Sequence, residues 1–220
     1  MRKITPLFKI IVMSLITASS AAIADEQLAV GITPEVAYVD VQHEGNTVRI
    51  QRNQDTANTI KDDYALTSRK CPPFCIRPIE LAPGVQTIGE LEMLDYLVKA
   101  SDPNENILVI DSRTPDWVAK GTIPGSVNIP WTLLKTDTSD PLTIAEILID
   151  SFGAEQLDEL WDFSNARTLV MFCNGMWCGQ SPRNIMTLTK FGYPPHKIKW
   201  YRGGMQNWEA LGLTTVSPGE

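Results

Sequence analysis

The chain has 220 residues and is 43% hydrophobic and 20% charged, which is the composition of a folded domain with a sizeable core. Its 26 acidic residues outnumber its 19 basic residues, giving a net charge of −7. Because such a surface repels phosphate backbones, we expect no nucleic-acid partner.

The N-terminus has the pattern of a secretory signal. Arg2, Lys3 and Lys9 give a positive start, and the apolar stretch after them ends in the A-x-A pattern of residues 22–24. That stretch is shorter than the ~20 apolar residues of a membrane span. We expect a cleaved signal peptide over residues 1–24, with an uncleaved anchor as the alternative. The mature chain would have a net charge of −10, no integral membrane span and a periplasmic location.

Residues 25–86 are predicted to form an N-terminal extension. Within residues 37–53, apolar and polar side chains alternate on both sides of Glu44-Gly45, which predicts a β-hairpin. Residues 69–84 are rich in proline and contain the sequence CPPFC. We expect an irregular linker or covering loop there.

From residue 87 onward, helix and strand patterns alternate. Thr87 and Glu90 have capping-box spacing before a helix whose apolar face would be Leu91, Leu94 and Val98. In chain order we then expect a buried strand over 106–113, a short helix over 114–121, a short strand over 125–130, helices over 141–153 and 154–163, a strand over 168–173, a helix over 181–193, a strand over 197–204 and a helix over 205–212.

Strands that alternate with helices predict a mainly parallel sheet with helices on both faces, a three-layer α/β/α fold. Active sites of such sheets lie beyond the carboxyl ends of the strands. Cys173 stands at such an end, directly before a loop and a helix start. This placement makes it the main candidate for chemistry.

The loop after Cys173 has the features of an anion-binding nest. A strand-to-helix turn directs several N–H groups at one point, and the helix dipole adds positive potential there. We expect Ser181 to be the N-cap and Pro182 to occupy the first helical position, with Gly175 and Gly179 allowing the curled backbone. A cysteine at this point has its thiolate stabilised and is a candidate nucleophile.

Four marks in this order resemble the rhodanese family. They are an Asp-x-Arg at residues 111–113, the GTIPGSVNIP stretch at 121–130, the strand-terminal Cys173, and a Gly-Gly-x-x-x-Trp at 203–208. The resemblance covers roughly residues 87–215. It implies a rhodanese-like domain over residues 87–220, following the small N-terminal hairpin extension.

The resemblance also implies a chemistry. In rhodaneses the cysteine attacks a sulfane sulfur donor such as thiosulfate, holds the sulfur as a persulfide and passes it to a thiophilic acceptor, without a cofactor. It implies a small sulfur-containing anion or a thiol as the partner of this chain. The residues expected to surround the sulfur are Asn174, Gly175, Met176, Trp177, Gly179, Gln180, Ser181 and Arg183.

Two features depart from the family pattern. Ser181 follows Cys173 by eight positions, whereas the family commonly has six, so we expect a wider pocket. The loop contains no basic residue to hold an anionic donor, and Arg183 comes only inside the helix. The identity of the donor therefore stays open.

Other family marks fit structural roles. We expect Asp111 and Arg113 to form a hydrogen-bonded pair at the end of a strand rather than to act as catalysts. Trp117 and Trp208 are expected in the core. Gly203 and Gly204 would serve tight backbone geometry.

Cys178 lies in the same loop as Cys173. Three roles fit its position: a thiol that resolves a persulfide or sulfenic acid on Cys173, a buried spectator, or half of a permanent Cys173–Cys178 bridge. Cys71 and Cys75 allow a structural disulfide, a redox pair that exchanges with the loop cysteines, or half of a four-cysteine zinc site. Because zinc would consume the nucleophile, we expect no metal.

Three functions are compatible with these residues. The first is a periplasmic sulfurtransferase with Cys173 as the sulfur carrier. The second is a thiol–disulfide oxidoreductase using Cys173 and Cys178, with a thiol-redox protein as partner. The third is a non-catalytic binding module whose cysteines are all bridged. We favour the first, because the cysteine is retained at the nest.

Overall fold

The central sheet has five parallel strands in the order β3-β9-β8-β4-β5. The computed structural model describes residues 28–158 and 160–218, so the expected signal peptide lies outside the described residues. The strands are β3 (Gln86–Ile88), β4 (Ile107–Asp111), β5 (Val127–Asn128), β8 (Thr168–Phe172) and β9 (Ile198–Tyr201).

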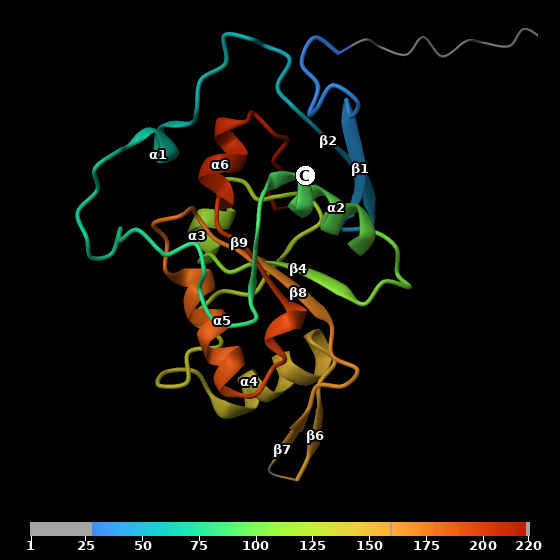
Figure 1. Cartoon of the computed structure of the whole chain (residues 1–220), viewed down its shortest axis with the longest axis vertical. Coiled ribbons are helices and arrows are strands. Elements are labelled where there is room, and N and C mark those ends of the chain that lie inside the picture. Colours follow the sequence, from blue (N-terminus) through green and yellow to red (C-terminus); the bar gives the residue numbers. More distant parts are fainter. Residues whose placement is uncertain (1–27, 159, 219–220) are drawn as a thin grey trace, which may run out of the picture.

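Helices cover both faces of this sheet, which confirms the three-layer α/β/α prediction (Figure 1). The face bearing α2 and α6 also carries the N-terminal hairpin, and the opposite face carries α4 and α5. The helices are α1 (Asp62–Ala65), α2 (Glu90–Ala100), α3 (Pro115–Val118), α4 (Pro141–Glu146) continued by a π-helical turn (Ile147–Ser151), α5 (Gln180–Lys190), a 3₁₀ turn (Pro195–Lys197) and α6 (Gly204–Ala210).

Strand β8 contributes to the core on both faces of the sheet. Leu169 and Met171 pack with α4 and α5, while Val170 and Phe172 pack with α2 and α6. All four side chains are completely buried, as expected for the centre of a doubly covered parallel sheet. Cys173 therefore follows the most enclosed strand of the fold.

The predicted N-terminal hairpin is confirmed. Strands β1 (Tyr38–His43) and β2 (Asn46–Gln51) pair antiparallel around Glu44 and Gly45, whose φ values of 48° and 82° suit a two-residue hairpin turn. The hairpin buries Val41 and Ile50 against the α2 and α6 face of the core. This packing gives the hairpin the support that an isolated hairpin lacks.

The capping box predicted at Thr87 is wrong. Thr87 lies in β3, where it pairs with Trp200 of β9. The N-cap of α2 is instead Gly89, whose N–H donates to the Glu92 carboxylate at 3.0 Å. The start of the helix is therefore shifted, and the buried face shifts with it. Met93, Leu94 and Leu97 point into the core, whereas the predicted face residues Leu91 and Val98 are exposed.

The helix predicted over residues 154–163 is also wrong. The segment forms a small hairpin, β6 (Glu155–Leu157) with β7 (Leu160–Asp162). Ala154 and Phe163, at its two ends, are both buried in the same core cluster. A ten-residue helix would hold its ends ~15 Å apart, whereas a hairpin returns the chain to its starting point. Tertiary anchoring thus overrides the helical periodicity.

Within the described residues, no helix combines the length and the apolar character that crossing a bilayer requires.

Candidate active site

The start of the loop after β8 is held by its neighbours. The Ser112 N–H donates to the Phe172 carbonyl at 3.0 Å, and the Met205 N–H donates to the Cys173 carbonyl at 3.0 Å. Gly204 makes the second contact possible, because at its φ of +55° a Cβ atom would collide with that carbonyl oxygen. The start of α6 therefore fixes the backbone of Cys173.

The Cys173 thiol is buried, with only 2% of its surface exposed. Its Sγ accepts a hydrogen bond from the Ser181 hydroxyl at 3.1 Å, and that hydroxyl accepts one from Trp200 Nε1 at 3.2 Å. The predicted N-cap role of Ser181 is wrong, because α5 begins at Gln180 with Gly179 as its cap. The hydroxyl serves the sulfur atom instead.

Burial raises the pKa of the Cys173 thiol, but hydrogen bonds from the Cys178 thiol, the Ser181 hydroxyl and the amides of Ser181 and Gly175 outweigh it and lower the pKa to about 7. The pKa of Cys178 moves the opposite way, well above its ordinary value. Burial is the main cause, followed by its hydrogen bond to Cys173 and the charge there. Cys173 is therefore the thiolate of the pair, and Cys178 is the proton donor beside it.

The loop amides are divided between the two sulfur atoms. Those of Gly175 and Ser181 serve Cys173, and those of Asn174 and Gln180 serve Cys178. Both cysteines are free thiols in this structure, so the bridged state is not the one seen here. The nest expected for one sulfur atom holds two.

Asp111 and Arg113 form the strand-end pair expected from the sequence. The Arg113 Nη2 to Asp111 Oδ2 distance is 2.6 Å, and both side chains are buried. Thr122 also donates to Asp111 Oδ2, at 2.7 Å. Because the register of β4 and β8 places Asp111 beside Phe172, this ion pair braces the end of the sheet from which the Cys173 loop starts.

Tyr64 connects this ion pair to the loop. Its hydroxyl accepts a hydrogen bond from Arg113 Nη1 at 3.1 Å and donates one to Asn174 Oδ1 at 3.4 Å. Burial raises the pKa of the Tyr64 phenol, which keeps it a neutral donor. Tyr64 belongs to residues 60–79, a segment of the extension that we call the strap.

The strap lies directly on the loop. The Arg77 N–H donates to the Met176 carbonyl at 2.8 Å, and the rings of Phe74 and Trp177 are 5.1 Å apart. Arg69 stacks over both rings. The segment expected to be a linker or covering loop is therefore a cover over the loop that follows Cys173.

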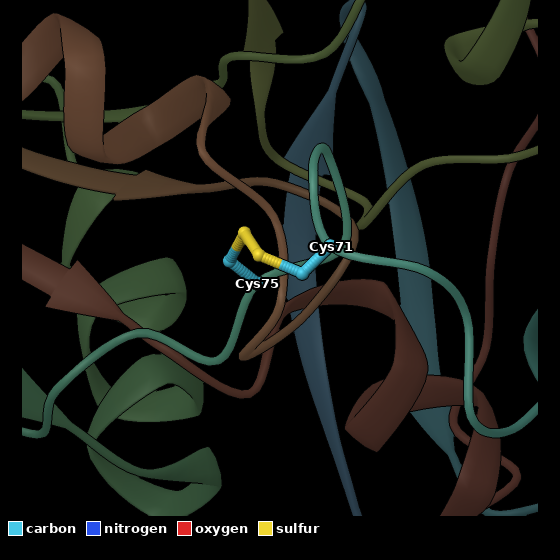
Figure 2. Close-up of a disulfide and its surroundings, with 2 residues drawn as sticks. All are labelled: Cys71 and Cys75. Carbon is cyan, nitrogen blue, oxygen red and sulfur yellow. A yellow bond between two sulfur atoms is a disulfide. The ribbon is translucent and has the colours of Figure 1, made fainter.

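Cys71 and Cys75 form a disulfide within the strap, on an irregular loop (Figure 2). Both line a cavity of about 870 Å³ between the strap and the Cys173 loop. Within the described residues, no group of His, Cys, Asp and Glu side chains has the arrangement of a metal site.

The expected binding residues do not all face the nucleophile. Met176 and Trp177 line the cavity under the strap, where Trp177 Nε1 donates to Gln206 Oε1 at 2.7 Å. Arg183 lies in a separate groove of about 350 Å³, with its guanidinium 4.9 Å from the Trp131 ring. Asn174, Gly175, Gln180 and Ser181 are the expected residues that contact the two sulfur atoms.

Arg77 was missed by reasoning from the sequence. Its guanidinium packs against Gly179, so closely that a Cβ atom there would meet it. The strap therefore supplies a cation next to a loop that has none of its own. The only signal for it was the mixture of arginines and prolines around CPPFC, which has no periodicity to interpret.

Several solved structures resemble parts of the chain. The BH2092 protein from Bacillus halodurans is 15% identical with a TM-score of 0.41, and the match covers 60% of this chain and 77% of that one. The RPA3614 protein from Rhodopseudomonas palustris, described as a possible tyrosine phosphatase, is 17% identical with a TM-score of 0.38, covering 60% and 85%. The human single-domain sulfurtransferase TSTD1 is 21% identical with a TM-score of 0.36, covering 56% and 95%.

None of the curated proteins compared with this chain is similar enough to count as a match. The description of the Rhodanese-like domain, in contrast, matches residues 93–211, more than half of the chain. That range contains β4, β8 and β9, the Asp111–Arg113 pair and the Cys173 loop. The chain belongs to the rhodanese-like domain family.

Proposed function

We propose that this protein is a periplasmic sulfurtransferase that carries sulfane sulfur as a persulfide on Cys173 and passes it to a thiol. One observation carries the proposal: the Cys173 sulfur lies among the Ser181 hydroxyl and two loop amides, and its pKa is lowered to about 7 despite complete burial. A thiolate is the form of cysteine that attacks sulfur. Membership of the rhodanese-like family supports this activity.

In the first half-reaction the Cys173 thiolate attacks the sulfane sulfur of the donor. A bond forms between Cys173 Sγ and that sulfur, and the donor's remaining group leaves with the bonding electron pair. In the second half-reaction an acceptor thiolate attacks the outer sulfur, and the Cys173 thiolate leaves. The hydrogen bonds that stabilise the Cys173 thiolate therefore assist both half-reactions, since Cys173 is the nucleophile in the first and the leaving group in the second.

A small anion is the donor class that the charges around the loop favour. Arg77 lies against Gly179, and Arg183 and Lys190 line the groove on that side of the loop, where Lys135 is paired with Asp137. This basic cluster contrasts with the net charge of −7 of the whole chain. It would raise the local concentration of an anionic donor.

Thiol–disulfide exchange is the second candidate function. It is favoured by the Cys178 thiol, which hydrogen-bonds to the Cys173 sulfur. Attack of Cys178 on an oxidised Cys173 would close a disulfide and move only electrons. The partner would be a thiol-redox protein.

The deciding experiment is mass spectrometry of the reduced chain after exposure to thiosulfate or a polysulfide. We expect the peptide that carries Cys173 to gain the mass of one sulfur atom, and the Cys173→Ser variant to gain none. Cys71→Ser/Cys75→Ser serves as a comparison that retains both loop thiols. Cys178→Ser, which removes the neighbouring thiol that could discharge the persulfide, should retain the sulfur longest. Sulfur retained in Cys173→Ser, or no sulfur on Cys173 in Cys178→Ser, would overturn the proposal.

A further inference from the structure

The two cysteine pairs of this protein are in opposite redox states. Cys71 and Cys75 are joined as a disulfide, whereas Cys173 and Cys178 are both thiols. The question is whether the two pairs lie close enough to exchange.

The contacts of the strap place the residues around Cys75 beside Met176 and Trp177 of the loop. Cys75 lies between Phe74, whose ring is 5.1 Å from that of Trp177, and Arg77, whose N–H binds the Met176 carbonyl at 2.8 Å. Trp177 is the residue directly before Cys178. Contacts on both sides of Cys75 therefore hold it over the segment of the loop that leads into Cys178.

Space for movement is present at the same place. The cavity of about 870 Å³ is lined by Cys71 and Cys75 on the strap side and by Met176 and Trp177 on the loop side. Cys178 is buried and does not line this cavity, so exchange requires the Trp177 segment of the loop to move into this space. Cys75 is half-buried against the loop, whereas Cys71 is exposed to solvent, so Cys75 is the nearer partner and Cys71 is open to an external thiol.

We propose that Cys71 and Cys75 are the resident reductant of the active-site loop: as a dithiol, they reduce a Cys173–Cys178 disulfide and restore the nucleophile. This role builds on the proposed sulfurtransferase function, since it resets the loop when no acceptor takes the sulfur. An external thiol reductant then regenerates the strap dithiol.

The loop disulfide arises when Cys178 resolves the persulfide. The Cys178 thiolate attacks Cys173 Sγ, the bond between that sulfur and the outer sulfur breaks, and the outer sulfur leaves as hydrogen sulfide. The product is a Cys173–Cys178 disulfide. No external oxidant is needed, because the sulfane sulfur accepts the two electrons.

Reduction follows by two exchanges. The Cys75 thiolate attacks Cys178 Sγ, which breaks the loop disulfide and releases the Cys173 thiolate. The Cys71 thiolate then attacks Cys75 Sγ, which closes the strap disulfide and releases Cys178. The protons of Cys71 and Cys75 end on the loop thiols, so two electrons and two protons have moved.

The direction of attack follows from the environments of the two loop sulfurs. The thiol of lower pKa is the better leaving group in disulfide exchange, and here that is Cys173, with a pKa of about 7. Cys178 is therefore the sulfur atom that is attacked. It is also the one whose preceding residue touches the strap.

Removal of Cys71 should trap the intermediate. Fully reduced Cys71→Ser protein is treated with one equivalent of oxidised glutathione, which closes the loop disulfide without any sulfane sulfur, and is then digested under acid quench. We expect a linkage between Cys75 and Cys178, with Cys173 free. Fragment spectra are required, because Cys173 and Cys178 share one tryptic peptide.

There are two matched controls. Cys71→Ser/Cys178→Ser should lose the linkage. In Cys75→Ser, the corresponding linkage between Cys71 and Cys178 should form far less. If Cys71→Ser yields only a Cys173–Cys178 disulfide, the proposal fails. Should that variant not fold, reduced wild-type protein gives the same answer. Its disulfide should then appear at Cys71–Cys75 several times faster than in Cys178→Ser, and equal rates would overturn the proposal.

This trap is independent of sulfur loading. If Cys173 never gains sulfur but the Cys75–Cys178 linkage forms, the sulfurtransferase function fails and the internal reductant stands. If sulfur loads but no linkage forms, the reverse holds.

Discussion

Tyr64 and Arg113 are 49 residues apart in the chain, yet the Arg113 guanidinium donates a hydrogen bond to the Tyr64 hydroxyl over 3.1 Å inside the protein. The same hydroxyl binds the Asn174 side chain, next to the nucleophile. The strap therefore reaches the ion pair at the end of β4 and the loop at the end of β8 through one atom. Four predictions follow from this region of the structure.

Tyr64→Phe should lower the free energy of unfolding by about 1–3 kcal/mol, because Arg113 loses a buried acceptor and Asn174 loses a donor. Chemical denaturation of the protein measures this change. Tyr38→Phe, at an exposed tyrosine of the hairpin, is the control and should change the value little. Equal effects of the two substitutions would show that the Tyr64 hydroxyl contributes nothing.

Asp111→Asn should destabilise the protein by about 3–5 kcal/mol, because it leaves the Arg113 charge buried and uncompensated. The exposed Asp40–Arg49 pair offers a direct comparison, since breaking it with Asp40→Asn should cost less than about 1 kcal/mol. Both values come from denaturation curves under the same conditions. A small loss for Asp111→Asn would mean that the pair is not a structural support.

The rate at which iodoacetamide labels Cys173 should follow its thiolate. The rate should fall tenfold for each pH unit below about 7 and level off above it, because the pKa of Cys173 is about 7. Ser181→Ala removes the hydroxyl bond to the sulfur, so the pKa should rise and the labelling rate at neutral pH should fall by about tenfold, recovering at alkaline pH. Fragment spectra of the tryptic peptide that carries Cys173 and Cys178 distinguish the label on Cys173 from a label on Cys178.

Thr189→Ala is the control for this profile, since it removes another α5 hydroxyl, one that binds only the Met186 carbonyl. Its profile should match the wild type. A Ser181→Ala profile with an unchanged midpoint would show that the hydroxyl does not stabilise the thiolate.

Gly204→Ala should both destabilise the protein and abolish sulfur loading, because the added Cβ would meet the Cys173 carbonyl oxygen. Gly45→Ala separates this collision from backbone strain: its φ is also positive, at +82°, but no atom lies within 4 Å of the added Cβ. We expect a loss of about 1–2 kcal/mol at Gly45, from the left-handed conformation alone. The loss at Gly204 should be clearly greater, as measured by thermal unfolding, and similar losses would contradict the collision.

The sheet could be predicted from the sequence because its central strands are continuous apolar runs. Residues 107–111 and 168–172 have few polar interruptions, and a strand buried on both faces requires this. Cys173 was identifiable for the same reason, since the apolar run ends at it. These signals are local and can be recognised without knowing what packs on them.

The errors arose where distant contacts decide the local structure. Residues 154–163 have a helical pattern, but the anchoring of Ala154 and Phe163 in one core cluster closes them into a hairpin. The strap gave no usable pattern, because its contacts with the loop do not form a repeating face. Tyr64 and Phe74 contact the loop through their side chains, and Arg77 does so through its backbone N–H and its guanidinium. The role of Ser181 changed for a similar reason, since a sulfur atom competes for its hydroxyl.

Strand β3 forms one edge of the sheet through Gln86–Ile88, and it lies before residue 93, where the family match begins. In a chain shortened to the matched range, β9 would be the edge strand. Its backbone N–H and C=O groups that now bond to β3 would then be free to pair with a strand of another molecule. Exposed edges of this kind pair between molecules and lead to aggregation. Strand β3, at the junction between the N-terminal extension and the rhodanese-like domain, thus protects β9 from pairing with another molecule.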